Sequence, residues 1–201
     1  MAQLLTTATS SDEAARAAEA YNLFPLPPVT VSCSHEHAGS AGTVSISATT
    51  LYATVGDIRA SLQRSGIEKL VVVNGHGGNY VLGNIVQEAS VDGPHVGLFP
   101  TSGDWATARA AGGLVTDGHE DMHAGELETS ILLYATPELV RPGAADWDAS
   151  DRPYLHSLGF RGYTSSGVIG RPSLGTAEKG EAVLASLVDS FRELVETMTD
   201  G

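Results

Sequence analysis

The feature that most constrains the fold of this chain is KLVVV at residues 69–73, a short run with almost no polar interruption. The segment before it repeats apolar residues at helical spacing from Leu51 to Leu62 and stops at Gly66, a residue typical of helix C-termini. A strand that is apolar on both faces has to be buried on both faces, as happens when helices cover a parallel sheet. We therefore predict an α/β fold over residues 1–201, with one layered domain and a mostly parallel sheet flanked by helices.

Other segments continue this alternation of strands and helices. Further strands are predicted at 28–34 (PVTVSCS) and 95–100 (HVGLFP), where β-branched and aromatic residues gather. The remaining predicted segments are helices at 80–89 and about 176–199, apolar structure at 127–134 and mostly loop at 141–175.

The composition excludes several classes of partner. The formal net charge is −13 and only 11 residues are Lys or Arg, which argues against binding to nucleic acid or to an anionic membrane surface. No apolar run reaches the roughly 20 residues of a membrane helix, and the N-terminus lacks the basic and apolar regions of a secretion signal. The single cysteine, Cys33, is predicted to be a small buried side chain in a reducing compartment. These features together predict a cytoplasmic protein.

Polar residues follow the central strand directly, in the loop NGHGGN at 74–79. Ligands of open α/β sheets gather at the carboxyl ends of the strands, so His76 stands where a ligand or an ion is expected. The glycines allow positive φ and close approach of the backbone to a ligand. A tight turn with an incidental histidine would explain the same loop. The predicted substrate-binding residues are Asn74, Gly77, Gly78 and Asn79.

Two more clusters combine histidine with acidic residues. HEDMHAGELETS at 119–130 holds two histidines and four acidic residues, a mixture that can bind Zn²⁺ or Mn²⁺ and move protons for an attacking water. A solvated acidic loop that caps the next element explains this pattern equally well. His35 and His37 project the same way if their segment is extended, so both imidazoles could face one cleft, although a structural role fits either of them.

Taken together, HEHAGSAGTVSIS, VNGHGGN and HAGELETS resemble in order and spacing the creatininase (creatinine amidohydrolase) family, over nearly the whole chain. The resemblance implies a metal-dependent hydrolase that opens small cyclic or linear amide bonds. It also implies a compact α/β layered domain, assembly as a hexamer, and two divalent ions per subunit, either Zn²⁺, Mn²⁺ or Fe²⁺. Formamide hydrolases and a peptidase that trims a redox-cofactor precursor peptide are among the family's members.

The resemblance implies roles for individual residues. His76 matches a metal-binding histidine, and Glu128 is the preferred metal-site carboxylate. His123 matches a catalytic histidine that assists proton transfer. Glu126 is the second carboxylate candidate, and we assign it to catalysis beside His123.

Two departures from the family pattern bear on activity. Gly78 stands where members that hydrolyse creatinine have a glutamate, which argues against creatinine as the substrate. The opening AQLLTTAT lies best over the family segment HLPLxTDT, so the first strand is expected to be missing, and Ala8 takes the place of a bridging aspartate. His35 and His37 are the candidate metal ligands that could replace the lost ones.

The resulting prediction is a metal-dependent amidohydrolase that cleaves the C–N bond of a small-molecule amide, non-peptide, cyclic or linear, and assembles as a homo-oligomer. Two alternatives stay open: a catalytically impaired or truncated homologue, and a small-molecule binding module without hydrolysis. Metal content separates the enzyme from the impaired homologue, and ligand binding without turnover would identify the binding module.

Overall fold

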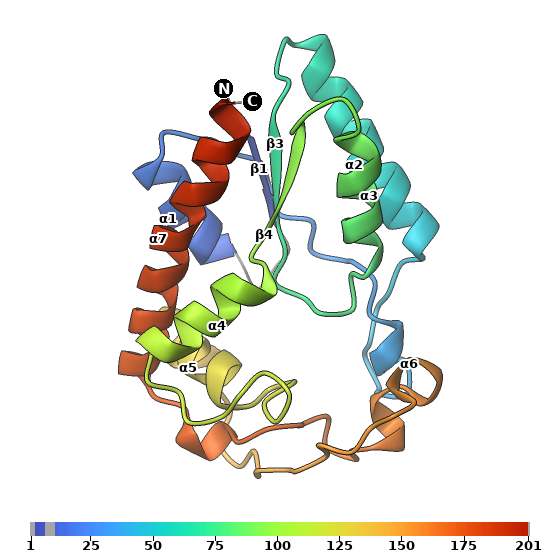
Figure 1. The fold of residues 1–201 in the computed structure, drawn as a ribbon. Helices are drawn as coiled ribbons and strands as arrows, with labels where there is room; N and C mark the ends of the chain where they lie inside the picture. Colours follow the sequence, from blue (N-terminus) through green and yellow to red (C-terminus); the bar gives the residue numbers. More distant parts are fainter. Residues whose placement is uncertain (1–2, 7–10, 201) are drawn as a thin grey trace. The chain divides into compact units, whose positions relative to one another are not determined.

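The structure, a computed structural model, describes residues 3–6 and 11–200 (Figure 1). The chain forms two compact units. The first consists of Met1–Ser34, Val44–Thr101 and Val188–Gly201, and the second of His35–Thr43 and Ser102–Leu187. The assignment of a single domain to residues 1–201 stays a prediction.

Within the described residues, the first unit is built on a four-stranded parallel sheet in the order β2-β1-β3-β4. Leu70 of β3 pairs with Gln3 of β1 on one side and with Val96 of β4 on the other. The α/β fold class is confirmed, as are the strands predicted at 69–73 and 95–100. The strands are β1 (Gln3–Thr6), β2 (Phe24–Pro25), β3 (Leu70–Val73) and β4 (Val96–Phe99).

Strand β3 is buried along its whole length, and its side chains alternate between the two faces of the sheet. On one face, Leu70 and Val72 pack in a core with α2 (Ala48–Arg64) and α3 (Val81–Ala89). Helix α2 begins where the Ser47 hydroxyl accepts a hydrogen bond from a backbone N–H of the first turn. Both helices confirm the predicted pattern. Other buried members of this core are Cys33, Leu51, Val55, Leu82, Ile85, Ala89 and Val96.

Helices also cover the other side of the sheet, where α1 (Ser11–Ala20) and the end of α7 (Ala177–Asp200) lie (Figure 1). The rings of Phe99 in β4 and Phe191 in α7 meet edge to face, with their centroids 5.0 Å apart. Phe191 also contacts the ring of Tyr21, at a centroid distance of 5.7 Å. These contacts explain the apolar spacing of the predicted C-terminal helix, which is confirmed.

One expectation for the first unit needs correction. Residues 28–34, predicted as a strand, lie outside every named strand. The N–H groups of Cys33 and Ser34 donate to side-chain oxygens, which replaces pairing with a neighbouring strand. Gln3–Thr6 form β1 between β2 and β3, and the expectation that the family's first strand is missing stays a prediction. Ala8 lies outside the described residues.

The second unit is mainly helices and loops. Helix α4 was not predicted, because Ala108 is its one buried hydrophobic residue and its apolar pattern is weak. The apolar segment at 127–134 is part of α5, and residues 141–175 are mostly loop, as predicted. The helices of this unit are α4 (Ser102–Ala111), α5 (Glu126–Ala135), α6 (Leu155–Leu158) and the first part of α7.

Short 3₁₀ helices and isolated backbone pairings complete the second unit. Ile169 pairs antiparallel with His123, and Gly170 pairs antiparallel with Trp147. None of the helices in residues 3–6 and 11–200 combines the length and the apolar character needed to cross a bilayer. The 3₁₀ helices lie at His35–His37, Pro137–Leu139, Phe160–Gly162 and Pro172–Leu174.

Candidate functional site

The loop after β3 belongs to the first unit and is braced by two asparagine side chains. The Asn74 side-chain oxygen accepts hydrogen bonds from the Asn79 amide at 2.9 Å and from the His76 backbone N–H at 3.3 Å. The Asn79 side-chain oxygen accepts from the backbone N–H of Cys33 at 3.1 Å, and Asn79 is buried. These contacts hold the loop in shape, and substrate binding by Asn74 and Asn79 stays a prediction.

The imidazole of His76 lies against the segment at 28–34, which belongs to no named strand. Its Nε2 atom lies 3.2 Å from the Ser34 hydroxyl oxygen. Gly77 has open space where a Cβ atom would stand, and it lacks the positive φ that we expected for this loop. Position 77 therefore does not need glycine for its backbone conformation, and the loop has room for a larger side chain there.

The acidic residues of HEDMHAGELETS, at 119–130, make different contacts within the second unit. Asp121, which is 5% exposed, accepts hydrogen bonds from the backbone N–H groups of Glu126 at 2.6 Å and Leu127 at 2.9 Å. Its carboxylate also lies 3.1 Å from the Arg109 guanidinium. Asp121 thus caps the start of α5, where backbone N–H groups lack partners within the helix.

Glycines make room for the Asp121 carboxylate. A Cβ atom on either Gly125 or Gly170 would collide with its Oδ1 atom, and Gly170 has a φ of +148° that other residues rarely adopt. The backbone around this carboxylate is therefore restricted to glycine at both positions.

Glu126 is fully buried and its carboxylate is surrounded by donors. The Lys179 ammonium lies 2.5 Å away, the Thr116 hydroxyl 2.7 Å and the Thr116 backbone N–H 3.0 Å, and Val115 N–H donates from 3.1 Å. Burial raises the pKa of Glu126, but hydrogen bonds from Lys179 and Thr116 outweigh burial and hold the pKa below its usual value. This arrangement favours a structural role, and the catalytic role assigned to Glu126 stays a prediction.

The lowered pKa of Glu126 predicts a loss of stability in acid. A carboxyl whose pKa is lower in the folded state stabilises the fold above its unfolded pKa, about 4.5, and loses this contribution as the pH falls through the folded pKa. The free energy of unfolding, measured in urea from pH 7 to pH 3, should therefore fall less steeply in Glu126→Gln than in the native protein. Equal slopes for the two proteins would contradict this assignment.

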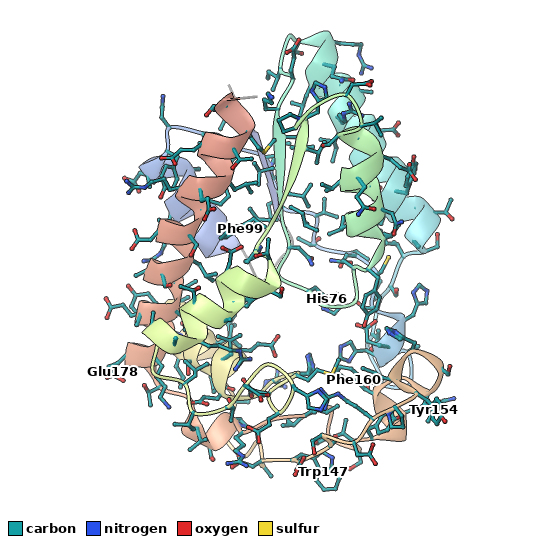
Figure 2. The ribbon with its side chains drawn as sticks, in the orientation of Figure 1. His76, Phe99, Trp147, Tyr154, Phe160 and Glu178 are labelled. Carbon is teal, nitrogen blue, oxygen red and sulfur yellow. The ribbon has the colours of Figure 1, made fainter. Side chains whose placement is uncertain are left out.

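Three aromatic rings meet in the second unit, and two of them are predicted site residues. The centroids of His37 and His123 are 4.5 Å apart, and Phe160 lies 4.3 Å from His37 and 5.1 Å from His123. Phe160 is labelled in Figure 2. Each imidazole has a carboxylate beside it. Glu36 lies 3.5 Å from Nε2 of His37, and Glu128 lies 3.7 Å from Nδ1 of His123.

Two further histidines of these clusters are exposed. His35 lies in the same 3₁₀ helix as His37, so its segment is not the extended one on which we expected both imidazoles to face one cleft. His119 is also exposed, and its Nε2 lies 2.8 Å from the Ser150 carbonyl oxygen. Phe160 was missed because nothing in GFRG distinguishes a ring beside histidines from an ordinary core residue.

The residues predicted to bind a metal ion are divided between the two units. Among residues 3–6 and 11–200, no group of three or more His, Cys, Asp or Glu side chains is placed to hold such an ion. His76 belongs to the first unit, whereas the other predicted metal ligands, His35, His37 and Glu128, belong to the second. The metal-binding roles of all four stay predictions, and no chemical step is assigned to a metal.

Comparison with known proteins identifies the family. The profile of the family Creatininase, described as creatinine amidohydrolase, matches residues 4–195. The chain belongs to the creatininase family. This creatininase-family chain is 33% identical over 181 residues to the mycofactocin precursor peptide peptidase of Mycobacterium ulcerans (strain Agy99). It is 32% identical over 177 residues to the protein of the same name from Mycolicibacterium smegmatis (strain ATCC 700084 / mc(2)155).

These alignments cover a larger share of this chain than of its relatives. They take in 87% and 85% of the creatininase-family chain, but 66% and 65% of the relatives. The chain therefore spans just under two thirds of the length of the curated relatives that it matches.

Solved structures support the fold. A crystal structure of creatinine amidohydrolase (creatininase) superposes with a TM-score of 0.81 at 20% identity, over 97% of this chain and 89% of that one. A putative creatinine amidohydrolase from Bacteroides fragilis NCTC 9343 gives a TM-score of 0.77 at 23% identity, over 100% and 90% of the two chains. Other solved creatininases include a form named for Mn and a form named Zn-Zn type, so divalent metals occur within the family.

The names of the curated relatives correct one expectation about this creatininase-family chain. Both relatives are named for a precursor peptide, which overturns the expectation of a small-molecule amide as the substrate. A peptide bond is itself a linear amide. The motifs therefore indicated an amide bond, but they did not indicate that a peptide contains it.

Proposed function

We propose that this chain hydrolyses an amide bond within a peptide. The observation that carries the proposal is its 33% identity to a mycofactocin precursor peptide peptidase over 87% of the chain. Because the chain spans only 66% of that relative, the activity, the substrate and the partners of the whole protein all belong to the proposal.

In this proposal His123 carries the proton transfer. Its backbone is fixed, because its N–H donates to the Ile169 carbonyl at 2.9 Å and its own carbonyl accepts from the Ile169 N–H at 2.9 Å. Glu128 faces the Nδ1 atom of His123 and favours the tautomer that is protonated at Nδ1. The Nε2 atom is then available to exchange a proton with the substrate.

The reaction balances as an ordinary hydrolysis. The water oxygen bonds to the amide carbon and the C–N bond breaks, and His123 delivers a proton to the departing nitrogen. The products are one peptide with a new carboxylate and one with a new amino group. In the structure, Glu128 also accepts a hydrogen bond from the Ala124 backbone N–H, which ties this carboxylate to the backbone next to His123.

The test is incubation of the purified chain with a mycofactocin precursor peptide and analysis of the products by mass spectrometry. Zn²⁺ and Mn²⁺ are supplied in separate reactions, because solved creatininases are named for these metals. Creatinine serves as the comparison substrate. Two peptide fragments whose masses sum to the substrate plus one water support the proposal, whereas turnover of creatinine with an intact peptide would contradict it.

Three finer expectations remain proposals for this chain. They are the use of two ions per subunit, the assembly as a hexamer, and the location in the cytoplasm. Elemental analysis of the purified chain addresses the first, and its mass in solution addresses the second.

A further inference from the structure

We propose that Phe160 is a positioning residue that holds the imidazoles of His37 and His123 in fixed orientations. This inference rests on the proposed function, in which the orientation of His123 matters because His123 transfers the proton. The Phe160 ring meets both imidazoles steeply, with interplanar angles of 69° to His37 and 66° to His123. The two imidazoles are tilted by 49° to each other. One phenyl ring therefore constrains two imidazoles that come from distant parts of the sequence.

The backbone is shaped to bring Phe160 to this place. The preceding residue, Gly159, has a φ of +63°, and a Cβ atom there would lie 2.8 Å from the carbonyl oxygen of Glu36. The segment therefore passes directly over the 3₁₀ helix that carries His37. Arg161, the residue after Phe160, also lies close to this region, because a Cβ atom on Gly39 would lie 2.8 Å from the Arg161 side chain.

The carboxylates beside the two histidines do not fix ring orientation in the same way. The separations of 3.5 Å for Glu36 and His37 and 3.7 Å for Glu128 and His123 exceed the usual length of an N–H···O hydrogen bond, about 2.7–3.2 Å. At these distances the attraction between charges is weakly directional. The ring contacts of Phe160 have a preferred geometry and so add a directional constraint.

Burial distinguishes Phe160 from aromatic residues that could contact a substrate. Phe160 is 5% exposed, whereas Trp147 and Tyr154 in the same unit are 48% and 68% exposed. All three side chains are labelled in Figure 2. A ring so deeply buried acts by supporting its neighbours. The backbone of His123 is already paired with Ile169, so Phe160 restricts the side-chain torsions of His123.

The test compares Phe160→Leu, which removes the ring, with Phe160→Tyr, which keeps it. For the peptide substrate, Phe160→Leu should lower kcat about tenfold and leave KM within about twofold, because the group that transfers the proton is misplaced while peptide binding is retained. Phe160→Tyr should recover most of the lost kcat. Phe99→Leu is the matched control, because Phe99 is 2% exposed in the first unit and its loss should lower stability without changing kcat of the folded protein.

A second readout does not depend on activity. In protein labelled at histidine, Phe160→Leu should shift the ring-proton resonances of His37 and His123 and leave those of His95 and His119 in place. Unchanged resonances for His37 and His123 would overturn the inference, as would a kcat that falls equally in Phe160→Leu and Phe160→Tyr. If the native protein cleaves no peptide, the proposed function fails, and the resonances alone decide whether Phe160 positions the histidines.

Discussion

Replacing Glu126 by glutamine should lower the free energy of unfolding by about 3–5 kcal/mol, the usual cost of removing one partner from a buried ion pair. The carboxylate is fully buried, and the Lys179 ammonium lies 2.5 Å from it. Glutamine retains an oxygen for the Val115 and Thr116 donors but leaves the lysine charge without its counterion. Urea denaturation followed by circular dichroism measures the change.

Two further variants test whether the loss of stability comes from the lysine charge that is left without a counterion. Glu126→Gln combined with Lys179→Met should recover part of the lost stability, because no buried charge is then left without a counterion. Glu120 is exposed in the same cluster, and Glu120→Gln should stay within about 0.5 kcal/mol of the native protein. A Glu126→Gln protein of native stability that has lost peptide hydrolysis would contradict the structural role and favour the catalytic assignment.

Replacing His123 by asparagine should lower kcat for peptide hydrolysis by roughly 10²–10⁴-fold, the range that proton transfer by a positioned side chain contributes. The backbone pairing with Ile169 does not involve the side chain, so the variant should fold. Initial rates at saturating peptide, with circular dichroism to confirm the fold, measure the effect.

His119→Asn is the matched control for that experiment. His119 belongs to the same HEDMHAGELETS cluster, is exposed, and contacts the Ser150 carbonyl instead of the three rings. Its replacement should leave kcat near the native value. Equal losses of activity in the two variants would show that the cluster acts as a whole, and the specific role of His123 would then be wrong.

The sequence predicted the parts of the fold that depend on local apolar pattern. KLVVV became β3 because four consecutive buried residues need cover on both faces, and the spacing of Leu51 and Val55 identified α2. The segment at 28–34 was wrongly predicted as a strand, because its β-branched residues satisfy strand propensity while its backbone donors bond side chains. Helix α4 has little apolar periodicity and gave no signal to find.

The candidate site was less accessible to sequence reasoning, because its acidic residues look alike in the sequence. Asp121 and Glu126 are buried, whereas Glu128 is more exposed and lies beside His123. Asp121 and Glu126 differ from the other acidic residues in their basic partners, Arg109 and Lys179, which lie outside the motif. The contact of Phe160 with His37 and His123 likewise depends on tertiary packing that no local pattern records.

Cleavage of a mycofactocin precursor peptide in water enriched in ¹⁸O is the most direct test of the proposed hydrolysis of a peptide bond. We expect the fragment with the new carboxyl terminus to gain one ¹⁸O atom, and His123→Asn to form this fragment far more slowly. A peptide that stays intact with the folded, metal-supplied protein, or a fragment without ¹⁸O, would show that the proposed hydrolysis is wrong.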